Sequence, residues 1–181
     1  TMAHPKPNTD AGLSSTPRQQ RVLRGVRVLS LALNLPGPAA LMRLQAMGAH
    51  CTKLEPPSPP GSASASGDPM AHYRPVAYQT MHQGVQTLQA DLKSSQGQAV
   101  LARLLRNTDV LITSFRPSAL NKLGLGWKSL QRQYPQLSCV AIVGAPGARA
   151  EEPGHDLTYV AEQGLVHGLK LPASLFADMG G

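Results

Sequence analysis

The sequence predicts an α/β fold in which helices flank a doubly wound, mostly parallel sheet. Short apolar runs rich in Val and Leu, typical of buried parallel strands, alternate with segments whose apolar residues recur at helical spacing. One strand, one helix and a second strand follow one another within about thirty residues, the size of a βαβ unit. The chain of 181 residues is long enough for one domain with a sizeable core.

The first βαβ unit begins where the composition changes abruptly, at Gly25. Residues 26–33 are a Val- and Leu-rich run and predict the first strand. Residues 39–47 carry apolar side chains at helical spacing, and Gly48 is placed to end that helix. Residues 50–55 predict the second strand, which completes the unit.

The rest of the chain repeats this alternation after a Pro- and Ser-rich stretch, residues 56–69, which predicts a loop. Ser94 or Ser95 is expected to cap the next helix. In order, we expect an extended segment at 86–92, a helix to about 106, a strand at 109–113, a short helix at 117–124, a helical turn at 129–134, a strand at 137–143, a loop at 144–153 and a helix from about 155. Alternating strands and helices favour a parallel sheet.

Residues 1–24 differ from everything that follows. They are rich in Pro, Ser, Thr, Gln and basic residues and show no hydrophobic periodicity. We therefore expect a disordered basic arm at 1–24 and a folded part at 25–181.

The formal net charge of +7 is spread along the chain and forms no run of Lys or Arg after the arm. Nucleic-acid sites usually combine a basic stripe with aromatic side chains for stacking, and aromatics make up only 4% of this chain. The charge distribution argues against nucleic-acid binding and suits a small polyanionic ligand.

Compartment and metal content follow from the apolar and cysteine residues. No stretch approaches the roughly 18–20 apolar residues of a membrane span. Cys51 and Cys139 lie in apolar segments and resemble buried thiols of a reducing compartment. The histidines form no metal-ligand spacing with them, so we expect no metal site. With no signal peptide visible, the expectation is a soluble, cytoplasmic protein.

Four segments stand in an order and at spacings that one family shares. They read GVRVLSLALNLPGPAALMRLQAMGAHCTKLEPP, ADLKSSQGQAVLARLLRNTDVLITSFRPSALNKLGLGWKSLQRQYPQL, PGHDLTY and LFADMGG. In that order they resemble the opening βαβ unit, the following stretch and the two active-site segments of the family III CoA-transferases (CaiB/BaiF-like proteins). That family includes the α-methylacyl-CoA racemases. The resemblance runs through residues 25–181 and corresponds to the N-terminal half of a family member.

The resemblance implies a Rossmann-like fold and CoA transfer from an acyl-CoA to a carboxylic acid. Asp178 matches the family nucleophile, whose carboxylate attacks the thioester to form a mixed anhydride and then an enzyme-bound CoA thioester. Gly180 and Gly181 would let backbone N–H groups approach the developing oxyanion. Coenzyme A is then a substrate, and no permanently bound cofactor is expected.

A racemase or epimerase is the alternative that the same resemblance implies. In that branch the residues matching His155 and Asp178 face opposite sides of the substrate α-carbon, and one removes the proton that the other returns. The His of PGHD favours this branch, because the transferases more often carry an aromatic residue there.

The family resemblance and the ends of the predicted strands also suggest contacts to CoA. Pro36 precedes a helix whose N-terminus is suited to a phosphate or carbonyl. Lys53 and Glu55 end a strand at the edge where open α/β sheets bind ligands. The full set of predicted contacts is Asn34, Pro36, Lys53, Glu55, Arg116, Ala119 and Lys122.

The chain departs from the family in three ways. Residues 82–87 lack the cation of a basic turn that family members carry before DLK, and His155 and Asp178 are closer in sequence than in the family. The sequence ends at Gly181, before the family's small domain, so we interpret it as a fragment, a split-off subunit or a degenerate paralogue. A non-catalytic domain that binds CoA or a partner is the third functional hypothesis. Family members form interlocked dimers, so we expect a homodimer or association with a missing C-terminal half.

Overall fold

The computed structural model describes residues 21–170, 172 and 176–177. The strands are β1 (Arg27–Ser30), β2 (His50–Glu55), β3 (Gln86–Gln89), β4 (Val110–Thr113) and β5 (Ser138–Ala141). The helices are α1 (Pro36–Ala46), α2 (Met70–Tyr73), α3 (Pro75–Met81), α4 (Ser95–Leu105), α5 (Pro117–Lys122), α6 (Trp127–Gln133), the 3-10 helix η1 (Gly147–Glu151) and α7 (Asp156–Glu162). The predicted strands and helices are all present; α2 and α3 are additional, and η1 lies within the predicted loop at 144–153.

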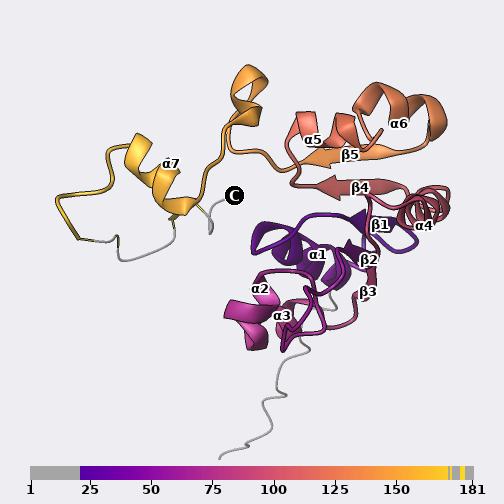
Figure 1. Cartoon of the computed structure of the whole chain (residues 1–181), viewed down its shortest axis with the longest axis horizontal. Coiled ribbons are helices and arrows are strands. Elements are labelled where there is room, and N and C mark those ends of the chain that lie inside the picture. Colours follow the sequence, from indigo (N-terminus) through magenta and orange to yellow (C-terminus); the bar gives the residue numbers. More distant parts are fainter. Residues whose placement is uncertain (1–20, 171, 173–175, 178–181) are drawn as a thin grey trace, which may run out of the picture.

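The five strands form one parallel sheet in the order β3-β2-β1-β4-β5 (Figure 1). The chain builds outward from β1 on one side through β2 and β3, then returns to the other side of β1 for β4 and β5. This confirms the predicted doubly wound α/β fold. The strand order reverses between β1 and β4, and open α/β sheets bind ligands at the carboxyl edge beside such a point.

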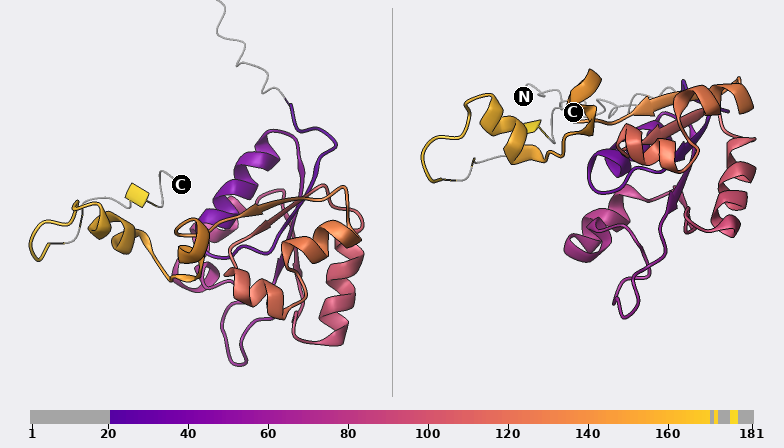
Figure 2. Two further views of the ribbon diagram at one scale, coloured as in Figure 1. Left: turned by 90° about the horizontal axis from the view of Figure 1, so that it is seen from above. Right: turned by 45° about the horizontal axis from the view of Figure 1, so that its top comes forward.

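Helices cover both faces of the sheet (Figure 2, left). On β1, Val28 packs into a core cluster with Leu41 of α1, and the next residue, Leu29, packs into a second cluster with Leu101 of α4. Because successive side chains of a strand point to opposite faces, the apolar run of β1 supplies both clusters. A central strand buried on both faces fixes the carboxyl edge on which the site is built.

Helix α1 begins at Pro36, three residues before the predicted start at residue 39. Proline is tolerated in the first helical turn, where its missing N–H would have had no helical partner. A side chain at Gly37 would place a Cβ atom 2.5 Å from Cβ of Ala32. Glycine therefore lets the start of α1 lie directly against the end of the strand β1.

The Pro- and Ser-rich loop after β2 returns the chain to the carboxyl edge of the sheet. A Cβ atom at Gly67 would overlap the backbone carbonyl of Pro56, so the two ends of the loop pass each other with room only for glycine. The loop ends at Asp68, which is completely buried, and α2 and α3 follow. The sequence predicted neither helix, and the four residues of α2 are too few to show a hydrophobic period.

The described part of the chain begins before the predicted domain boundary at Gly25. The N–H of Leu23 donates to the carbonyl of Met47 at 3.0 Å, and the Leu23 side chain packs against the α1 core cluster. Residues 1–20 of the predicted disordered arm lie outside the described residues. None of the helices in the described part has the length and apolarity needed to cross a bilayer.

The two cysteines are free thiols. Cys51 on β2 is buried, as predicted, whereas Cys139 on β5 is only half-buried. Burial raises the pKa of Cys51 to about 11, so it stays a neutral core side chain.

Candidate functional site

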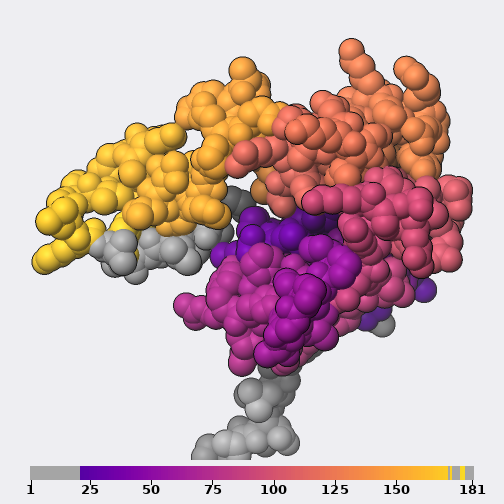
Figure 3. Space-filling model, in the orientation of Figure 1, coloured from indigo at the N-terminus to yellow at the C-terminus, as the bar shows by residue number. Residues whose placement is uncertain are grey.

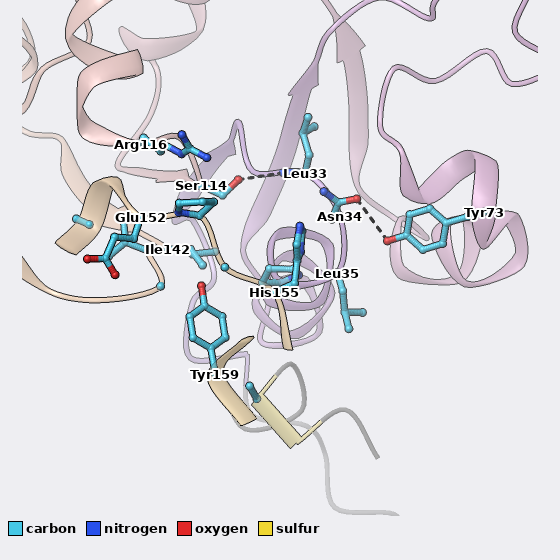
Figure 4. Close-up of a pocket in the computed structure, with 17 residues that line it drawn as sticks. Leu33, Asn34, Leu35, Tyr73, Ser114, Arg116, Ile142, Glu152, His155 and Tyr159 are labelled. Atoms are coloured by element: carbon cyan, nitrogen blue, oxygen red, sulfur yellow. Dashed lines mark hydrogen bonds between the residues drawn. The ribbon is translucent and has the colours of Figure 1, made fainter. Parts of the chain in front are cut away.

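An open pocket of about 730 Å³ lies at the carboxyl edge of β1, β4 and β5 (Figure 4). Beyond β5 the chain leaves the sheet, and the segment from η1 through α7 projects beside the main body (Figures 1 and 3). The pocket is lined by the turn after β1 (33–36), the ends of β4 and β5 (Ser114, Arg116 and 142–144), the η1–α7 segment (150–155 in part, and Tyr159), Tyr73 of α2 and Ala177. The lining thus comes from the edge where parallel sheets bind ligands.

Four of the predicted site residues meet in this pocket, namely Asn34, Pro36, Arg116 and His155. The predicted nucleophile Asp178 lies outside the described residues. Its neighbour Ala177 lines the pocket, and the Ala177 N–H donates to Oδ1 of the buried Asp156 at 2.7 Å.

Asn34 occupies the turn between β1 and α1 in the left-handed backbone region, with φ of 60°. Among non-glycine residues, asparagine adopts this conformation with little penalty. Its N–H donates to Oδ1 of Asp68 at 3.1 Å, and its own Oδ1 accepts from the Tyr73 hydroxyl at 3.4 Å (Figure 4). The Asn34 turn is therefore tied to the start of α2.

The start of α1 offers few N–H groups to a ligand. Pro36 and Pro38 have none, and the N–H of Ala39 donates to the carbonyl of Leu35 at 3.0 Å. Gly37 is left as the only donor among the first three helical positions. The predicted role of Pro36 in CoA binding stays a prediction. Since Pro36 has no N–H, that role would be to shape the pocket wall and not to donate a hydrogen bond.

Arg116 precedes α5 and lines the pocket with an exposed side chain. The start of α5 is already occupied, because Glu151 accepts from both the N–H and the hydroxyl of Ser118 at 2.7 Å. Arg116 forms no ion pair with any described residue. Its guanidinium is thus the cation at this pocket that remains available to an anionic ligand.

His155 directly precedes α7, and its N–H donates to Oγ1 of Thr158 at 3.4 Å. Its imidazole and the Tyr159 hydroxyl both lie at the pocket (Figure 4). Tyr159 packs so closely on Gly144 and Gly154 that a Cβ atom at either position would overlap its hydroxyl. Tyr159 was not among the residues predicted from the sequence, although it lies on α7 only four residues after His155.

Lys53 and Glu55 do not line the pocket, and both are fully buried. Lys53 Nζ forms an ion pair with Asp68 and lies 3.4 Å from Oε2 of Glu55 and 3.1 Å from Nε2 of His82. Glu55 also accepts from the Tyr78 hydroxyl at 2.9 Å. The segment 68–82 covers this end of β2, whereas the pocket lies beside the carboxyl ends of β1, β4 and β5.

His82 is oriented so that it accepts a hydrogen bond from Lys53. Its Nδ1 lies 2.6 Å from the carbonyl of Tyr78, which assigns the ring proton to Nδ1 and leaves Nε2 as an acceptor. The His82 ring stacks on the Tyr78 ring with centroids 4.0 Å apart. Burial, with the positive charge of Lys53 adding to it, lowers the pKa of His82, and burial raises the pKa of Tyr78 to about 12. Both rings are therefore held neutral.

The other two predicted CoA contacts, Ala119 and Lys122, lie on α5 outside the pocket lining. Ala119 is half-buried and Lys122 is exposed. Their roles stay predictions. Within the described ranges, no group of three or more His, Cys, Asp or Glu side chains is arranged to hold a metal ion.

Comparison with known proteins gives one consistent result. The chain is 34% identical over 155 residues to the succinate–glutarate CoA-transferase of Agrobacterium fabrum. This alignment covers 80% of this chain and 38% of that protein. It is 31% identical over 168 residues to the human alpha-methylacyl-CoA racemase, covering 88% of this chain and 40% of the racemase. The chain thus spans about two fifths of the length of these curated relatives.

The structure agrees with a solved member of the same group. It superposes on the crystal structure of a CAIB/BAIF family protein from Brucella suis with a TM-score of 0.70 and 27% identity, covering 88% of this chain and 46% of that one. The sequence profile of CoA-transferase family III matches residues 23–174, most of the chain. The chain therefore belongs to CoA-transferase family III.

Proposed function

We propose that this chain forms the CoA-binding part of an enzyme that transfers CoA from an acyl-CoA to a carboxylic acid. One observation carries the proposal: a single pocket brings together Arg116, His155 and Ala177, the residue directly before Asp178. A cation that lines the same pocket as the residue before the candidate nucleophile suits a polyanionic thioester.

In the proposed reaction the Asp178 carboxylate attacks the thioester carbonyl. The C–S bond breaks, CoA leaves as a thiolate, and a mixed anhydride joins Asp178 to the acyl group. The thiolate then attacks the aspartyl carbonyl, releases the donor acid and leaves a CoA thioester on Asp178. The acceptor carboxylate attacks this thioester, and a second exchange yields the new acyl-CoA and regenerates the free carboxylate.

Arg116 is proposed to pair with a phosphate of CoA, since its guanidinium has no protein partner among the described residues. Replacing Arg116 with Gln is expected to weaken CoA binding about tenfold, in line with the loss of a charge-assisted hydrogen bond. Isothermal titration with CoA measures this. Arg103→Gln, a change to an exposed cation on α4, is the matched control and is expected to leave the affinity unchanged.

Racemisation is the second candidate, and the position of His155 at the pocket favours it. In that reaction His155 and Asp178 exchange the α-proton of a 2-methylacyl-CoA through an enolate. The imidazole of His155 would act on one side of the α-carbon and the carboxyl group of Asp178 on the other, one as base and the other as acid.

The two reactions are separated by product. Succinyl-CoA with glutarate tests transfer through the appearance of glutaryl-CoA, and a 2-methylacyl-CoA in deuterated water tests exchange of the α-proton. Asp178→Asn is expected to abolish either reaction, His155→Asn to abolish only proton exchange, and Asp109→Asn at the far end of the sheet to affect neither. Intact-mass analysis after acyl-CoA treatment is expected to detect an adduct that Asp178→Asn lacks.

Binding of CoA without either reaction would replace both candidates by a non-catalytic CoA-binding domain. A folded chain that neither binds CoA nor reacts would overturn the proposal. Association with a second copy, or with a polypeptide that supplies the rest of the family's length, belongs to the same proposal. Sedimentation of the chain with and without CoA measures it.

A further inference from the structure

A group of polar side chains, three of them buried, lies beside the pocket and takes no part in the chemistry proposed above. We call it the buried polar cluster, and its members are the buried Lys53, Glu55 and Asp68 and the half-buried Tyr78 and His82. Lys53 and Asp68 are 0% exposed. Burying ionised groups costs free energy, so we expect such a cluster to contribute to the fold or to the site.

Asp68 connects this cluster to the pocket through one oxygen atom. Its Oδ1 accepts from the N–H of Asn34 at 3.1 Å and from the N–H of Met70 at 2.9 Å. Asn34 lies in the turn after β1, and Met70 begins α2, which carries Tyr73. Asn34 and Tyr73 both line the pocket, and the Tyr73 hydroxyl donates to Asn34 Oδ1 (Figure 4).

Lys53 holds the other oxygen of the same carboxylate. Its ammonium pairs with Oδ2 of Asp68, and His82 Nε2 accepts from it at 3.1 Å. Glu55 Oε2 lies 3.4 Å from the same nitrogen. With partners on several sides, the ammonium cannot turn away, and it fixes the direction in which Asp68 presents Oδ1.

We propose that Asp68 is a positioning residue, held by Lys53, that joins the Asn34 turn to α2 and thereby sets the width of this side of the pocket. That the bound molecule is a CoA thioester rests on the proposed function. The hydrogen-bonding role of Asp68 does not, and the two are tested by separate measurements.

Two double variants separate the effect of the acceptor oxygen of Asp68 from the effect of its charge. Lys53→Met with Asp68→Ala removes the ion pair and the acceptor, whereas Lys53→Met with Asp68→Asn removes the ion pair but keeps an amide oxygen at the same place. Each removes one cation and one anion, so the cluster's net charge is the same in both. A difference in behaviour between the two variants is therefore due to the side-chain acceptor at residue 68.

The first readout is amide hydrogen exchange, resolved by residue with NMR. In the Asp68→Ala double variant, the Asn34 and Met70 amides are expected to exchange at least about tenfold faster than in the Asp68→Asn double variant. The amides of Leu111 and Ile112 in β4 should exchange alike in both, which excludes a general loss of stability. Equal exchange of Asn34 in the two variants would overturn the proposal.

The second readout is CoA affinity by isothermal titration. The alanine double variant is expected to bind CoA at least about tenfold more weakly than the asparagine double variant, because the two pocket walls lose their link. Equal affinities together with unequal exchange would show that Asp68 orders the turn without setting the pocket, and would overturn its positioning role. Wild-type protein that fails to bind CoA refutes the proposed function and leaves the exchange result to decide the role of Asp68 in the fold.

The wild-type chain supplies a test that does not depend on the variants folding. Asn34 and Met70 donate to the same oxygen, and neither amide has another acceptor within the described residues. Both amides should be protected from exchange by at least about a hundredfold relative to an unstructured peptide, and with similar opening free energies. An unprotected Asn34 amide in the wild type would contradict the proposal directly.

Discussion

Asp68 and Asp109 each accept a backbone N–H near one end of β1, but Asp68 is buried and Asp109 is partly exposed. Asp109 Oδ2 accepts the N–H of Arg27 at 2.8 Å, and Asp68 Oδ1 accepts the N–H of Asn34 at 3.1 Å. Each carboxylate also pairs with a cation, Arg27 or Lys53. The side chains of Arg27 and Asp109 are 46% and 36% exposed, whereas those of Lys53 and Asp68 are completely buried.

Burial decides what each pair contributes. An exposed pair is solvated whether or not it forms, so its net contribution is small. A buried pair has given up its hydration, so each member depends on the other, and removing one leaves a charge that water cannot reach. The structure at the carboxyl end of β1, where the pocket lies, therefore depends on buried groups whose substitution is costly. The structure at the amino end depends on exposed groups whose substitution costs little.

The largest effect is expected for Lys53→Met. This change leaves the carboxylates of Asp68 and Glu55 buried without a cation, and we expect it to lower the free energy of unfolding by about 3–5 kcal/mol. Urea denaturation followed by circular dichroism measures the change. The Lys53→Met and Asp68→Asn double variant should recover part of the loss, because one of the two unpaired charges is gone. A single variant within about 1 kcal/mol of wild type would show that the buried pair is energetically neutral.

Gly37→Ala is expected to have the next largest effect, since it acts on the same end of β1 without touching a charge. The new Cβ atom would lie 2.5 Å from Cβ and 2.7 Å from the carbonyl oxygen of Ala32. Relieving such an overlap should cost about 1–3 kcal/mol and shift α1 away from the strand. Thermal unfolding measures the loss.

Gly61→Ala is a useful control, because its backbone φ of +76° disfavours alanine but no atom lies within 4 Å of a new Cβ. It isolates the backbone penalty, about 1 kcal/mol. If Gly37→Ala lost no more stability than this control, the close contact between α1 and β1 would not be needed.

The pH dependence of stability separates the two ends of β1. Because the pKa of His82 is lowered in the folded state, the unfolded chain binds a proton first as the pH falls. The stability linked to His82 is complete above its unfolded pKa of 6.5 and is lost as the pH falls below that value toward the lower folded one. Arg27 beside it lowers the pKa of Asp109 to about 2, so the contribution of Asp109 is present above pH 3.8 and disappears between there and about 2.

Denaturation curves recorded at a series of pH values distinguish these windows. His82→Gln supplies an amide oxygen that can accept from Lys53 and does not titrate, so it should flatten the profile below pH 6.5 while leaving the acidic step unchanged. An unaltered slope below pH 6.5 in this variant would assign that step to another group.

The fold was largely predictable from the sequence because its elements are local. The run at 26–33 is long, apolar and rich in branched residues, and Ser94 is a helix cap whose Oγ accepts from Gly97 at 3.0 Å in the structure. The four residues of α2 are too few to show a hydrophobic period, and the N–H of Met70 at its start donates to Asp68, a contact that periodicity does not reveal.

The candidate site was predictable only in part, for the opposite reason. Arg116 and His155 were predicted from the family resemblance. Asn34 and Arg116 follow the ends of β1 and β4, and the topology of a parallel sheet brings such positions to one edge. The same rule predicted a ligand contact for Lys53, but the partner that buries it, Asp68, returns through a loop whose path is set by backbone contacts such as that of Gly67 with Pro56. The path of this loop cannot be predicted from composition or hydrophobic periodicity.

The smallest effect is expected for Asp109→Asn, at the exposed end of β1. The amide oxygen can still accept the Arg27 N–H, and the lost ion pair is solvated, so the loss of unfolding free energy should be at most about one fifth of that for Lys53→Met. Raising NaCl from about 0.05 to 0.5 M should shrink the difference from wild type, since exposed charges are screened over a few ångströms at that ionic strength. The effect of Lys53→Met should hardly respond to salt, because no ions reach its surroundings. A salt-independent loss in Asp109→Asn as large as that of Lys53→Met would mean that burial does not set the difference between the two carboxylates.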